Sequence, residues 1–360
     1  MTATKSVTAS YHRPGDAVQR GKGMTDLTEL ETEARRFVAT HWGRDCAVAG
    51  FGPMEDGHAG LSFGFSVMRG AEEIVGVVLR LAPKGVRRSG NTDVYRQAPL
   101  LRALHAAGVK VPPILHAQST EDWFGTPFVM AKRLPGKTLI IWEPDPVFHG
   151  QVTDGWLKSA EALASIHRFD WRGDLSGWEE EREMRAEIER WAGILERTDD
   201  ADWIERGRRV AALLRGRPIA PSPVGLFHGD FQPGNVLFNQ GRIEAILDWE
   251  LAGIGPQLLD IGWLMMMGDP EAWDPVWAAK HVPPVAELAR VYQDAMGQDF
   301  DAIPYWEAMS CFIFGVISCL NVKLHRTGRR PDPMWDDIAS SVTHLFGRAE
   351  SLLLEGKNLP

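Results

Sequence analysis

Basic clusters and zinc-binding cysteine patterns are both missing from this sequence of 360 residues. It has 39 lysines and arginines against 48 aspartates and glutamates, a formal net charge of −9, and no long basic block. A nucleic-acid-binding protein usually shows clustered basic residues, so that function is not expected here. The three cysteines match no zinc-ligand spacing and are typical of reduced thiols in a cytoplasmic protein.

Long hydrophobic runs are scarce as well. The longest uncharged stretch, residues 308–322, is too short to span a bilayer, and we expect it to form a buried core helix. Residues 1–23 are polar and contain no apolar segment of the kind found in signal peptides, so we expect a flexible tail there. These features favour a cytoplasmic protein, monomeric or homodimeric, that does not bind a membrane.

The length of the chain exceeds what one compact core usually holds, so two lobes are expected. Residues 24–132 carry five strand-like apolar runs and one internal helical segment, at 91–108. Residues 133–360 are dominated by long amphipathic segments, and their strand signals lie within 225–250. We therefore predict an α+β protein with a small β-rich N-terminal lobe and a large helical C-terminal lobe.

The segment 228–250, HGDFQPGNVLFNQGRIEAILDWE, places polar residues around a short hairpin. Asp230 should lie in a loop, and a turn at Gln240–Gly241 returns the chain from Asn235 to Asp248. An amide oxygen and a carboxylate on the two arms of such a hairpin suit Mg²⁺. Asp230 would lie close enough to accept a proton from a hydroxyl, as phosphoryl transfer requires. The HGD motif alone would fit an ordinary turn, but the complete arrangement of Asp230, Asn235 and Asp248 favours a phosphoryl-transfer site.

This stretch resembles the catalytic centre of the aminoglycoside phosphotransferase and choline-kinase-like family, distant relatives of protein kinases. It is most similar to the phosphotransferases related to the kinase-like domain fused to certain acyl-CoA dehydrogenases. The segment ALASIHRFDW, residues 162–171, is similar to a helix in the same group. The resemblance covers roughly residues 30–350, and it implies a protein-kinase-like bilobal fold with ATP or GTP and Mg²⁺ as cofactors.

The same resemblance implies a role for each polar residue of the hairpin region. Asp230 would be the catalytic base, and His228 would support its loop. Asn235 and Asp248 would bind Mg²⁺, and Glu250 would be a nearby acidic group behind the metal ligands. In the stretch GIGPQLLD, where close relatives tend to carry an Asp-Pro pair, we expect the final residue, Asp260, to have a structural role.

The first lobe should then hold the nucleotide. Gly57, Gly60 and Ser62 lie in a stretch of small residues whose backbone N–H groups would approach phosphates, although a plain β-turn is the alternative. Arg80 occupies the place where kinase relatives carry a phosphate-pairing lysine, although it would also fit a surface strand position. The residue expected to pair with this cation is Gln97 instead of glutamate, which favours a nucleotide-binding pseudokinase as the alternative function.

The stretch VMAKRLPG, residues 129–136, resembles the interlobe hinge of the family. The resemblance implies that Met130 backs an adenine ring. It also implies that the backbone of Ala131 and Arg133 supplies the amide and carbonyl that bind the ring.

Aromatic residues follow the hairpin, and Trp263 comes soon after Asp248. Core packing is one interpretation, and an apolar acceptor pocket is the other. The acidic run at 179–183 would suit a polycationic aminoglycoside, but such runs are usually solvated helix faces. We therefore predict a small-molecule hydroxyl kinase, with hydroxyacyl or alcohol-type acceptors favoured and antibiotics possible. Metal-dependent hydrolysis is a weaker alternative, because the sequence lacks a second cluster of His and Asp ligands.

Overall fold

The computed structural model describes residues 27–54, 61–85, 88 and 92–355, so the expected tail at 1–23 lies outside the described residues. The chain divides into two compact units. The first comprises the chain up to Ala98 together with Pro113–Leu134, and the second comprises Pro99–Pro112 together with the chain from Pro135 onward.

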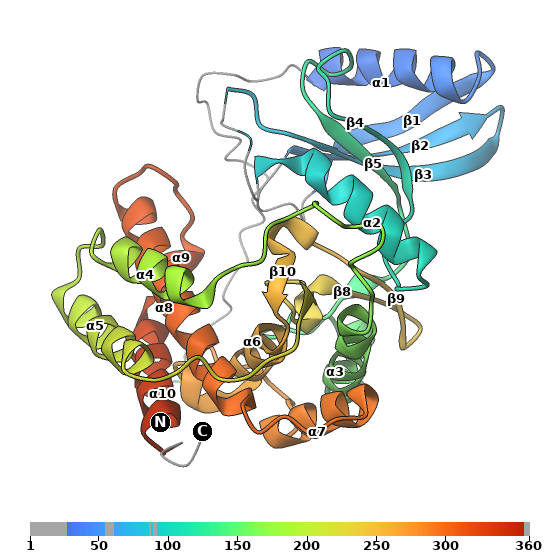
Figure 1. Ribbon diagram of the computed structural model, residues 1–360. Helices are drawn as coiled ribbons and strands as arrows, with labels where there is room; N and C mark the ends of the chain where they lie inside the picture. Colours follow the sequence, from blue (N-terminus) through green and yellow to red (C-terminus); the bar gives the residue numbers. More distant parts are fainter. Residues whose placement is uncertain (1–26, 55–60, 86–87, 89–91, 356–360) are drawn as a thin grey trace, which may run out of the picture. The chain divides into compact units, whose positions relative to one another are not determined.

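A five-stranded antiparallel sheet forms the first unit, with the strand order β1-β2-β3-β5-β4 (Figure 1). Its strands are β1 (Cys46–Pro53), β2 (Leu61–Arg69), β3 (Glu72–Leu81), β4 (Ile114–Gln118) and β5 (Phe128–Lys132). The five predicted strands are confirmed. Gly70, with a φ of 60°, lies in the tight turn between β2 and β3, a backbone region that glycine enters at little cost.

Helix α1 (Leu27–His41) packs on one face of this sheet. Its buried residues recur at the three- and four-residue spacing of one helix face: Leu30, Ala34, Phe37 and Val38. Phe37 contacts Phe128 of β5 edge-on, with ring centroids 5.3 Å apart. His116 of β4 lies against the same ring, with ring centroids also 5.3 Å apart. The core of the first unit is therefore a helix-on-sheet layer.

The second unit is mainly helical. Its helices are α2 (Gln97–Ala106), whose first two residues belong to the first unit, α3 (Val152–His167), α4 (Met184–Leu195), α5 (Ala201–Arg215), α6 (Leu258–Gly268), α7 (Val285–Met296), α8 (Ile303–Arg326), α9 (Met334–Asp337) and α10 (Ser341–Glu355). Helices α6 and α10 both pack on α8 (Figure 1). A Cβ added to Gly262 would lie 2.4 Å from the backbone of Trp306, so this glycine permits direct backbone contact between α6 and α8.

Helix α8 is long and apolar enough, by length and composition alone, to cross a membrane. This corrects our expectation that its apolar stretch is too short. The most apolar window of the helix is 61% buried inside the structure, as the core helix that we predicted should be. Cys311 and Cys319 lie in this helix, and both are buried free thiols.

Two small sheets support the loops of the second unit. Strands β6 (Lys137–Thr138), β8 (Val236–Asn239) and β9 (Arg242–Ile246) form one, and β7 (Val224–Phe227) pairs with β10 (Gly253–Pro256) in the other. The predicted hairpin is β8–β9, and its turn residues Gln240 and Gly241 have φ values of 49° and 72°. Positive φ at both positions matches the turn that favours the twist of paired strands. The sequence did not predict β6 or β10.

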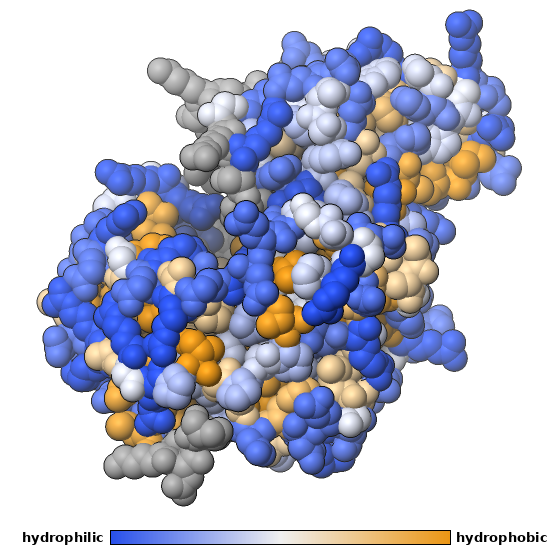
Figure 2. All heavy atoms as spheres, in the orientation of Figure 1, coloured by the Kyte–Doolittle hydropathy of each residue, from blue (hydrophilic) through white to orange (hydrophobic). Residues whose placement is uncertain are grey.

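The surface of the molecule in Figure 2 is mostly polar, with apolar side chains gathered in small groups. The most exposed large apolar side chains are Val276, at 78%, and Val147, at 59%. Scattered apolar side chains of this kind are normal on soluble proteins.

A buried charge cluster connects α8 to α10. Arg348 Nε lies 2.6 Å from Asp269 Oδ2 and 3.7 Å from Glu307 Oε1. Arg348 Nη1 lies 2.6 Å from Glu271 Oε2. Glu307 is almost fully buried, and burial together with its hydrogen bond to Asp269 raises the pKa of Glu307 to about 8. One arginine therefore faces three carboxyl groups, and the raised pKa of Glu307 favours its protonated form at neutral pH.

This proton makes the stability of the fold depend on pH. The folded protein keeps a proton that the unfolded chain releases near the ordinary pKa of 4.5, so stability falls as pH rises from there to about 8. Glu307→Gln should remove this decline in the free energy of unfolding, which amounts to up to about 1.4 kcal/mol per pH unit. The variant should therefore be more stable than wild type above pH 8. Urea unfolding across this range measures the effect. Glu271→Gln, at a side chain that is 71% exposed, is the control, and identical slopes for wild type and Glu307→Gln would contradict the assignment.

Candidate active site

The loop that carries Asp230 leaves the end of β7 and runs to the short 3₁₀ turn Pro233–Asn235. Gly229 has a φ of 88°, and a Cβ at this position would lie 2.5 Å from the carbonyl oxygen of Leu251. Only glycine fits there, because both the backbone conformation and the space exclude a side chain. The HGD sequence thus turns the chain sharply and presents Asp230 directly after the turn.

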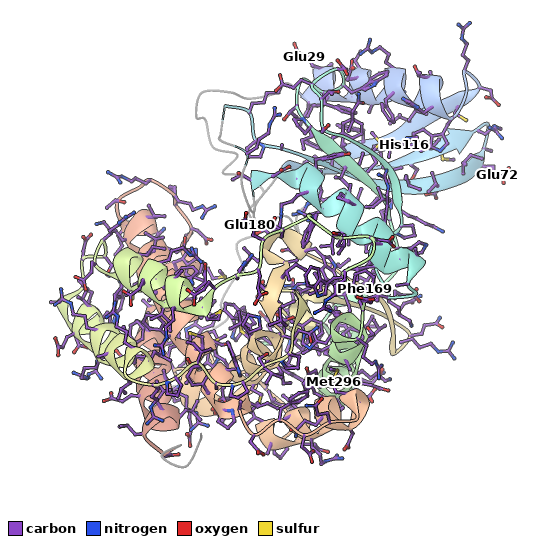
Figure 3. The ribbon with its side chains drawn as sticks, in the orientation of Figure 1. Glu29, Glu72, His116, Phe169, Glu180 and Met296 are labelled. Atoms are coloured by element: carbon purple, nitrogen blue, oxygen red, sulfur yellow. The ribbon has the colours of Figure 1, made fainter. Side chains whose placement is uncertain are left out.

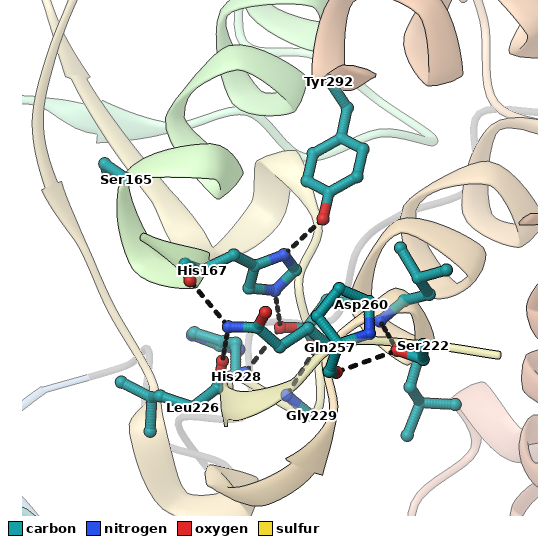
Figure 4. Close-up of polar contacts among 12 residues, drawn as sticks. Ser165, His167, Ser222, Leu226, His228, Gly229, Gln257, Asp260 and Tyr292 are labelled. Carbon is teal, nitrogen blue, oxygen red and sulfur yellow. Dashed lines mark hydrogen bonds and ion pairs between the residues drawn. The ribbon is translucent and has the colours of Figure 1, made fainter. Parts of the chain in front are cut away.

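Asp260, in the first turn of α6, anchors this loop (Figure 4). Its Oδ2 accepts a hydrogen bond from the backbone N–H of His228 at 2.6 Å, and its Oδ1 accepts one from Gly229 at 2.8 Å. The side chain is fully buried. A buried carboxylate needs such donors, so Asp260 and the loop backbone stabilise each other.

A second layer of side chains holds Asp260 (Figure 4). Asp260 Oδ2 also lies 3.1 Å from His167 Nε2, and His167 Nδ1 lies 2.7 Å from the Tyr292 hydroxyl. Gln257 donates to the carbonyl oxygens of His167 and Leu226, at 2.8 and 3.3 Å. This network joins α3, α6 and α7 to β7. His167 lies in the 162–171 segment that carried the family resemblance, but nothing in the sequence singled out Tyr292 or Gln257.

The Asp230 carboxylate has three hydrogen-bond donors around it. Trp263 Nε1 donates to Oδ1 at 2.8 Å, and Gln232 Nε2 donates to the same oxygen at 3.2 Å. Asn235 Nδ2 donates to Oδ2 at 3.0 Å and to the Asp230 carbonyl oxygen at 2.8 Å. The residue as a whole is nevertheless partly exposed.

Burial of the Asp230 carboxyl group raises its pKa to about 6, and the neighbouring Asp248 carboxylate acts in the same direction. The hydrogen bonds from Asn235 and Trp263 oppose this shift, because they stabilise the charged form. Asp230 is therefore still ionised at neutral pH, but it is a stronger base than an ordinary aspartate. A pKa near the working pH is typical of a general base.

His228 is fully buried and cannot exchange protons with a substrate. Its Nε2 lies 2.8 Å from the carbonyl oxygen of Leu247, and its Nδ1 lies 3.3 Å from the backbone N–H of Asp230. The carbonyl only accepts and the amide only donates, so these contacts assign the proton to Nε2. The supporting role of His228 stays a prediction, and these contacts join its ring to the loop backbone.

The two arms of the hairpin are tied together next to Asp230. The Leu247 N–H donates to the Asn235 carbonyl oxygen at 2.8 Å, which places Asp248 beside the Asn235 arm. Asp248 has a φ of 60°, a left-handed conformation that is uncommon for non-glycine residues and that aspartate enters more readily than most. Glu250 follows in a 3₁₀ turn (Trp249–Leu251) and is partly exposed.

The orientation of Asn235 fits a metal ligand. Its amide nitrogen faces two oxygens of Asp230 that can only accept, so the amide oxygen points the other way. That oxygen and the Asp248 carboxylate are hard donors of the type that Mg²⁺ binds, with phosphate oxygens and water completing its coordination.

Most of the aromatic residues that follow the hairpin belong to the core. Their buried members include Trp263, Trp273, Tyr305, Trp306 and Phe314. The three methionines at 265–267 are buried as well. Core packing is thus the correct interpretation for most of this set, whereas Trp263 also donates a hydrogen bond to Asp230.

The acidic run at 179–183 is not a helix face, which corrects our interpretation. Glu180 lies on the segment that leads to α4, and the helix begins only at Met184 (Figure 3). Glu181 forms a parallel bridge with Ile254 of β10, and Glu183 caps α4 by accepting from the backbone N–H groups of its first turn.

Of the residues predicted to approach the nucleotide phosphates, Ser62 and Arg80 are described, whereas Gly57 and Gly60 lie outside the described residues. Ser62 pairs with Arg80 across β2 and β3, so the two side chains share one face of the sheet. Arg80 Nη1 donates to Gln97 Oε1 at 3.5 Å, the contact that the sequence allowed in place of an ion pair. Phosphate binding by Arg80 stays a prediction.

The structure corrects two parts of the predicted hinge. Arg80 pairs with Val129, whereas Met130 pairs with Leu79, so the pleat points Met130 to the opposite face. Met130 is fully buried in the core beneath α1 and cannot back a nucleotide on the Arg80 face. The sequence did not show which face of the sheet Met130 points to, because β5 is apolar on both faces.

The backbone of the predicted hinge is largely committed to the sheet. The N–H of Arg133 donates to the Gly76 carbonyl oxygen at 2.8 Å, so it is not available to adenine. Ala131 lies in register with Val78 on one side and Ile114 on the other. A strand with a neighbour on each side uses its amide and carbonyl groups within the sheet.

Sequence comparison places this arrangement in a known family. The model of the phosphotransferase enzyme family, APH, matches residues 60–305. Chicken (Gallus gallus) acyl-CoA dehydrogenase family member 11 is 27% identical over 190 residues, which cover 52% of this chain and 24% of that protein. The chain thus spans about a quarter of the length of this relative.

Solved structures share the fold. A candidate aminoglycoside phosphotransferase from Ralstonia eutropha JMP134 superposes with a TM-score of 0.71 at 17% identity, over 89% of this chain and 98% of that one. Aminoglycoside phosphotransferase APH(4)-Ia, in a ternary complex with AMP-PNP and hygromycin B, superposes with a TM-score of 0.59 at 16% identity, over 90% and 99%. The predicted kinase-like α+β fold and enzyme class are confirmed. Since the family model matches more than half of the chain, the protein belongs to the phosphotransferase enzyme family.

Proposed function

We propose that this chain transfers the γ-phosphate of ATP, or of GTP, to a hydroxyl of a small molecule in a Mg²⁺-dependent reaction. The convergence of Asp230 and Asn235, with Asn235 Nδ2 3.0 Å from Asp230 Oδ2, carries this proposal. It puts a basic carboxylate beside oxygen ligands, the two parts that phosphoryl transfer needs from a protein. The AMP-PNP in the complex of APH(4)-Ia supports ATP as the donor.

Asp230 is the proton acceptor in the proposed reaction. As the acceptor oxygen bonds to the γ-phosphorus, its proton passes to the Asp230 carboxylate. The bond between that phosphorus and the bridging oxygen of the nucleotide breaks, and ADP or GDP leaves. Asn235 and Asp248 would hold Mg²⁺, which neutralises charge on the phosphates when bound. The anchoring of the loop by Asp260 keeps Asp230 in place without movement during the reaction.

Hydroxyacyl or alcohol-type acceptors are favoured over polycationic sugars. Aminoglycoside recognition needs clustered carboxylates, and Glu183 of the acidic run is already used as a helix cap. The similarity to an acyl-CoA dehydrogenase family member supports an acyl-type acceptor.

An acceptor screen coupled to nucleoside-diphosphate release tests the proposal. The panel should contain hydroxyacyl thioesters, simple alcohols, aminoglycosides and macrolides, each with ATP or GTP and with Mg²⁺ or excess EDTA. We expect acceptor-dependent release that EDTA abolishes. Nucleotide binding without turnover on any acceptor would favour a regulatory pseudokinase, the alternative suggested by Gln97 in the place where kinase relatives carry a glutamate.

A further inference from the structure

Helix α6 reaches the Asp230 loop at two points. Asp260 accepts from the loop backbone, and Trp263, three residues later, donates its indole N–H to Asp230 Oδ1 at 2.8 Å. Residues three apart lie on the same face of a helix. One rigid element thus fixes both the backbone of the loop and the side chain at its tip.

The Trp263 indole is itself held firmly. The residue is only 4% exposed, and its ring meets Phe314 edge-on at 5.6 Å. Behind it, Gly262 brings the backbone of α6 against Trp306 of α8. A hydrogen-bond donor that cannot rotate or withdraw fixes the orientation of its acceptor, since the bond weakens steeply when it bends.

The three donors around the Asp230 carboxylate occupy unequal numbers of lone pairs on its two oxygens. An ionised carboxylate has about four acceptor positions, two on each oxygen. Trp263 and Gln232 take the two on Oδ1, and Asn235 takes one on Oδ2. The remaining position is therefore on Oδ2, the oxygen nearer to the candidate metal ligand Asn235.

We infer that Trp263 is a positioning residue for phosphoryl transfer, which sets the rotation of the Asp230 carboxylate so that Oδ2 accepts the proton of the acceptor hydroxyl. This inference rests on the proposed function. It assigns to the indole N–H a role that core packing alone does not require.

Trp273 offers a matched control within the same aromatic group. Its Nε1 donates to the Met266 carbonyl oxygen at 2.8 Å, and its ring contacts Phe314 at 5.5 Å. It is 1% exposed, so it resembles Trp263 in burial, in ring neighbour and in hydrogen-bond length. It differs in the acceptor, which is a backbone carbonyl instead of the Asp230 carboxylate.

Steady-state kinetics with an acceptor found in the screen test the role. Trp263→Phe should lower kcat roughly 10- to 100-fold, the loss expected for a hydrogen bond to a charged group. The KM values for nucleotide and acceptor should stay close to wild type, because the interaction acts in the transition state. Trp273→Phe should leave kcat near wild type even though its melting temperature falls similarly. Wild-type kcat in Trp263→Phe, or equal kcat losses in both variants, would overturn the inference while leaving the proposed function intact.

The contact can also be tested without an acceptor. In ¹H–¹⁵N spectra, the Trp263 indole signal is identified by its absence from Trp263→Phe. Replacing Asp230 with asparagine should shift this signal upfield, since a neutral amide is a weaker acceptor than a carboxylate. The Trp273 signal should stay in place. An unmoved Trp263 signal would overturn the inference. Wild-type protein that transfers phosphate to no acceptor would contradict both the inference and the proposed function.

Discussion

Asp230→Asn should lower kcat by roughly 10²- to 10⁴-fold, the range that a general base contributes to catalysis. Asparagine keeps the shape of the side chain but cannot accept the proton of the acceptor hydroxyl. It also turns an NH₂ group toward Asn235 or Trp263, both of which already donate to this side chain. Turnover is measured by ADP release, and nucleotide affinity by calorimetry with AMP-PNP.

The contrast between two carboxylates separates the base from the metal ligand. We expect Asp230→Asn to bind AMP-PNP and Mg²⁺ about as well as wild type. Asp248→Asn should instead lose most of the Mg²⁺-dependent part of the nucleotide affinity, because the one charged protein ligand of the metal is replaced by a neutral amide. Nearly unchanged turnover in Asp230→Asn would contradict its role as the base.

Asp260→Asn should reduce both stability and activity. The asparagine must place an NH₂ group against the N–H of His228 or of Gly229, and neither can accept. We expect a loss of about 3 kcal/mol or more in the free energy of unfolding, since a buried charged network loses its acceptor. Displacement of the loop should also lower kcat by about 10²-fold. Urea denaturation and ADP release measure the two effects.

Asp294→Asn is the control for this substitution. Its side chain is 67% exposed on α7 and accepts from Arg290 at 2.8 Å. A surface ion pair of this kind contributes at most about 1 kcal/mol, so both stability and turnover should stay near wild type. If Asp260→Asn behaved like this control, the loop would not depend on α6 for its position.

The hairpin could be predicted from the sequence because its signals are local. Two short apolar strands flank Gln240–Gly241, and the turn type that these residues favour fixes the pairing of Asn239 with Arg242. A register shift between Leu237 and Phe238, which the sequence did not predict, then pairs Val236 with Ile246. The placement of Asn235 and Asp248 on neighbouring arms follows directly. The residues of one short segment therefore carried most of the candidate site.

The supporting network could not be predicted, because its members lie far apart in the sequence. His167 and Tyr292 are separated by 125 positions and meet only through the packing of α3 on α7. Helix α6 is buried all round, so it has no polar face and no helical periodicity for a sequence pattern to reveal. For that reason the hydrogen bond from Trp263 to Asp230 emerged only from the three-dimensional arrangement.

The sequence analysis did not predict short or fully buried strands, for a related reason. Strand β10 is buried along its whole length and pairs with β7, so its residues show no alternation of polar and apolar side chains. The same lack of alternation in β5 hid the direction of Met130. Sequence patterns report which side of an element faces water, and they lose that information when both sides are covered.

The proposed function is the transfer of a phosphoryl group from a nucleotide to an acceptor hydroxyl. ³¹P NMR of a reaction containing wild-type protein, ATP, Mg²⁺ and an acceptor from the screen tests it most directly. We predict a new phosphate monoester signal that grows in step with ADP. Growth of inorganic phosphate alone, with no phosphorylated acceptor, would contradict the claim and indicate hydrolysis.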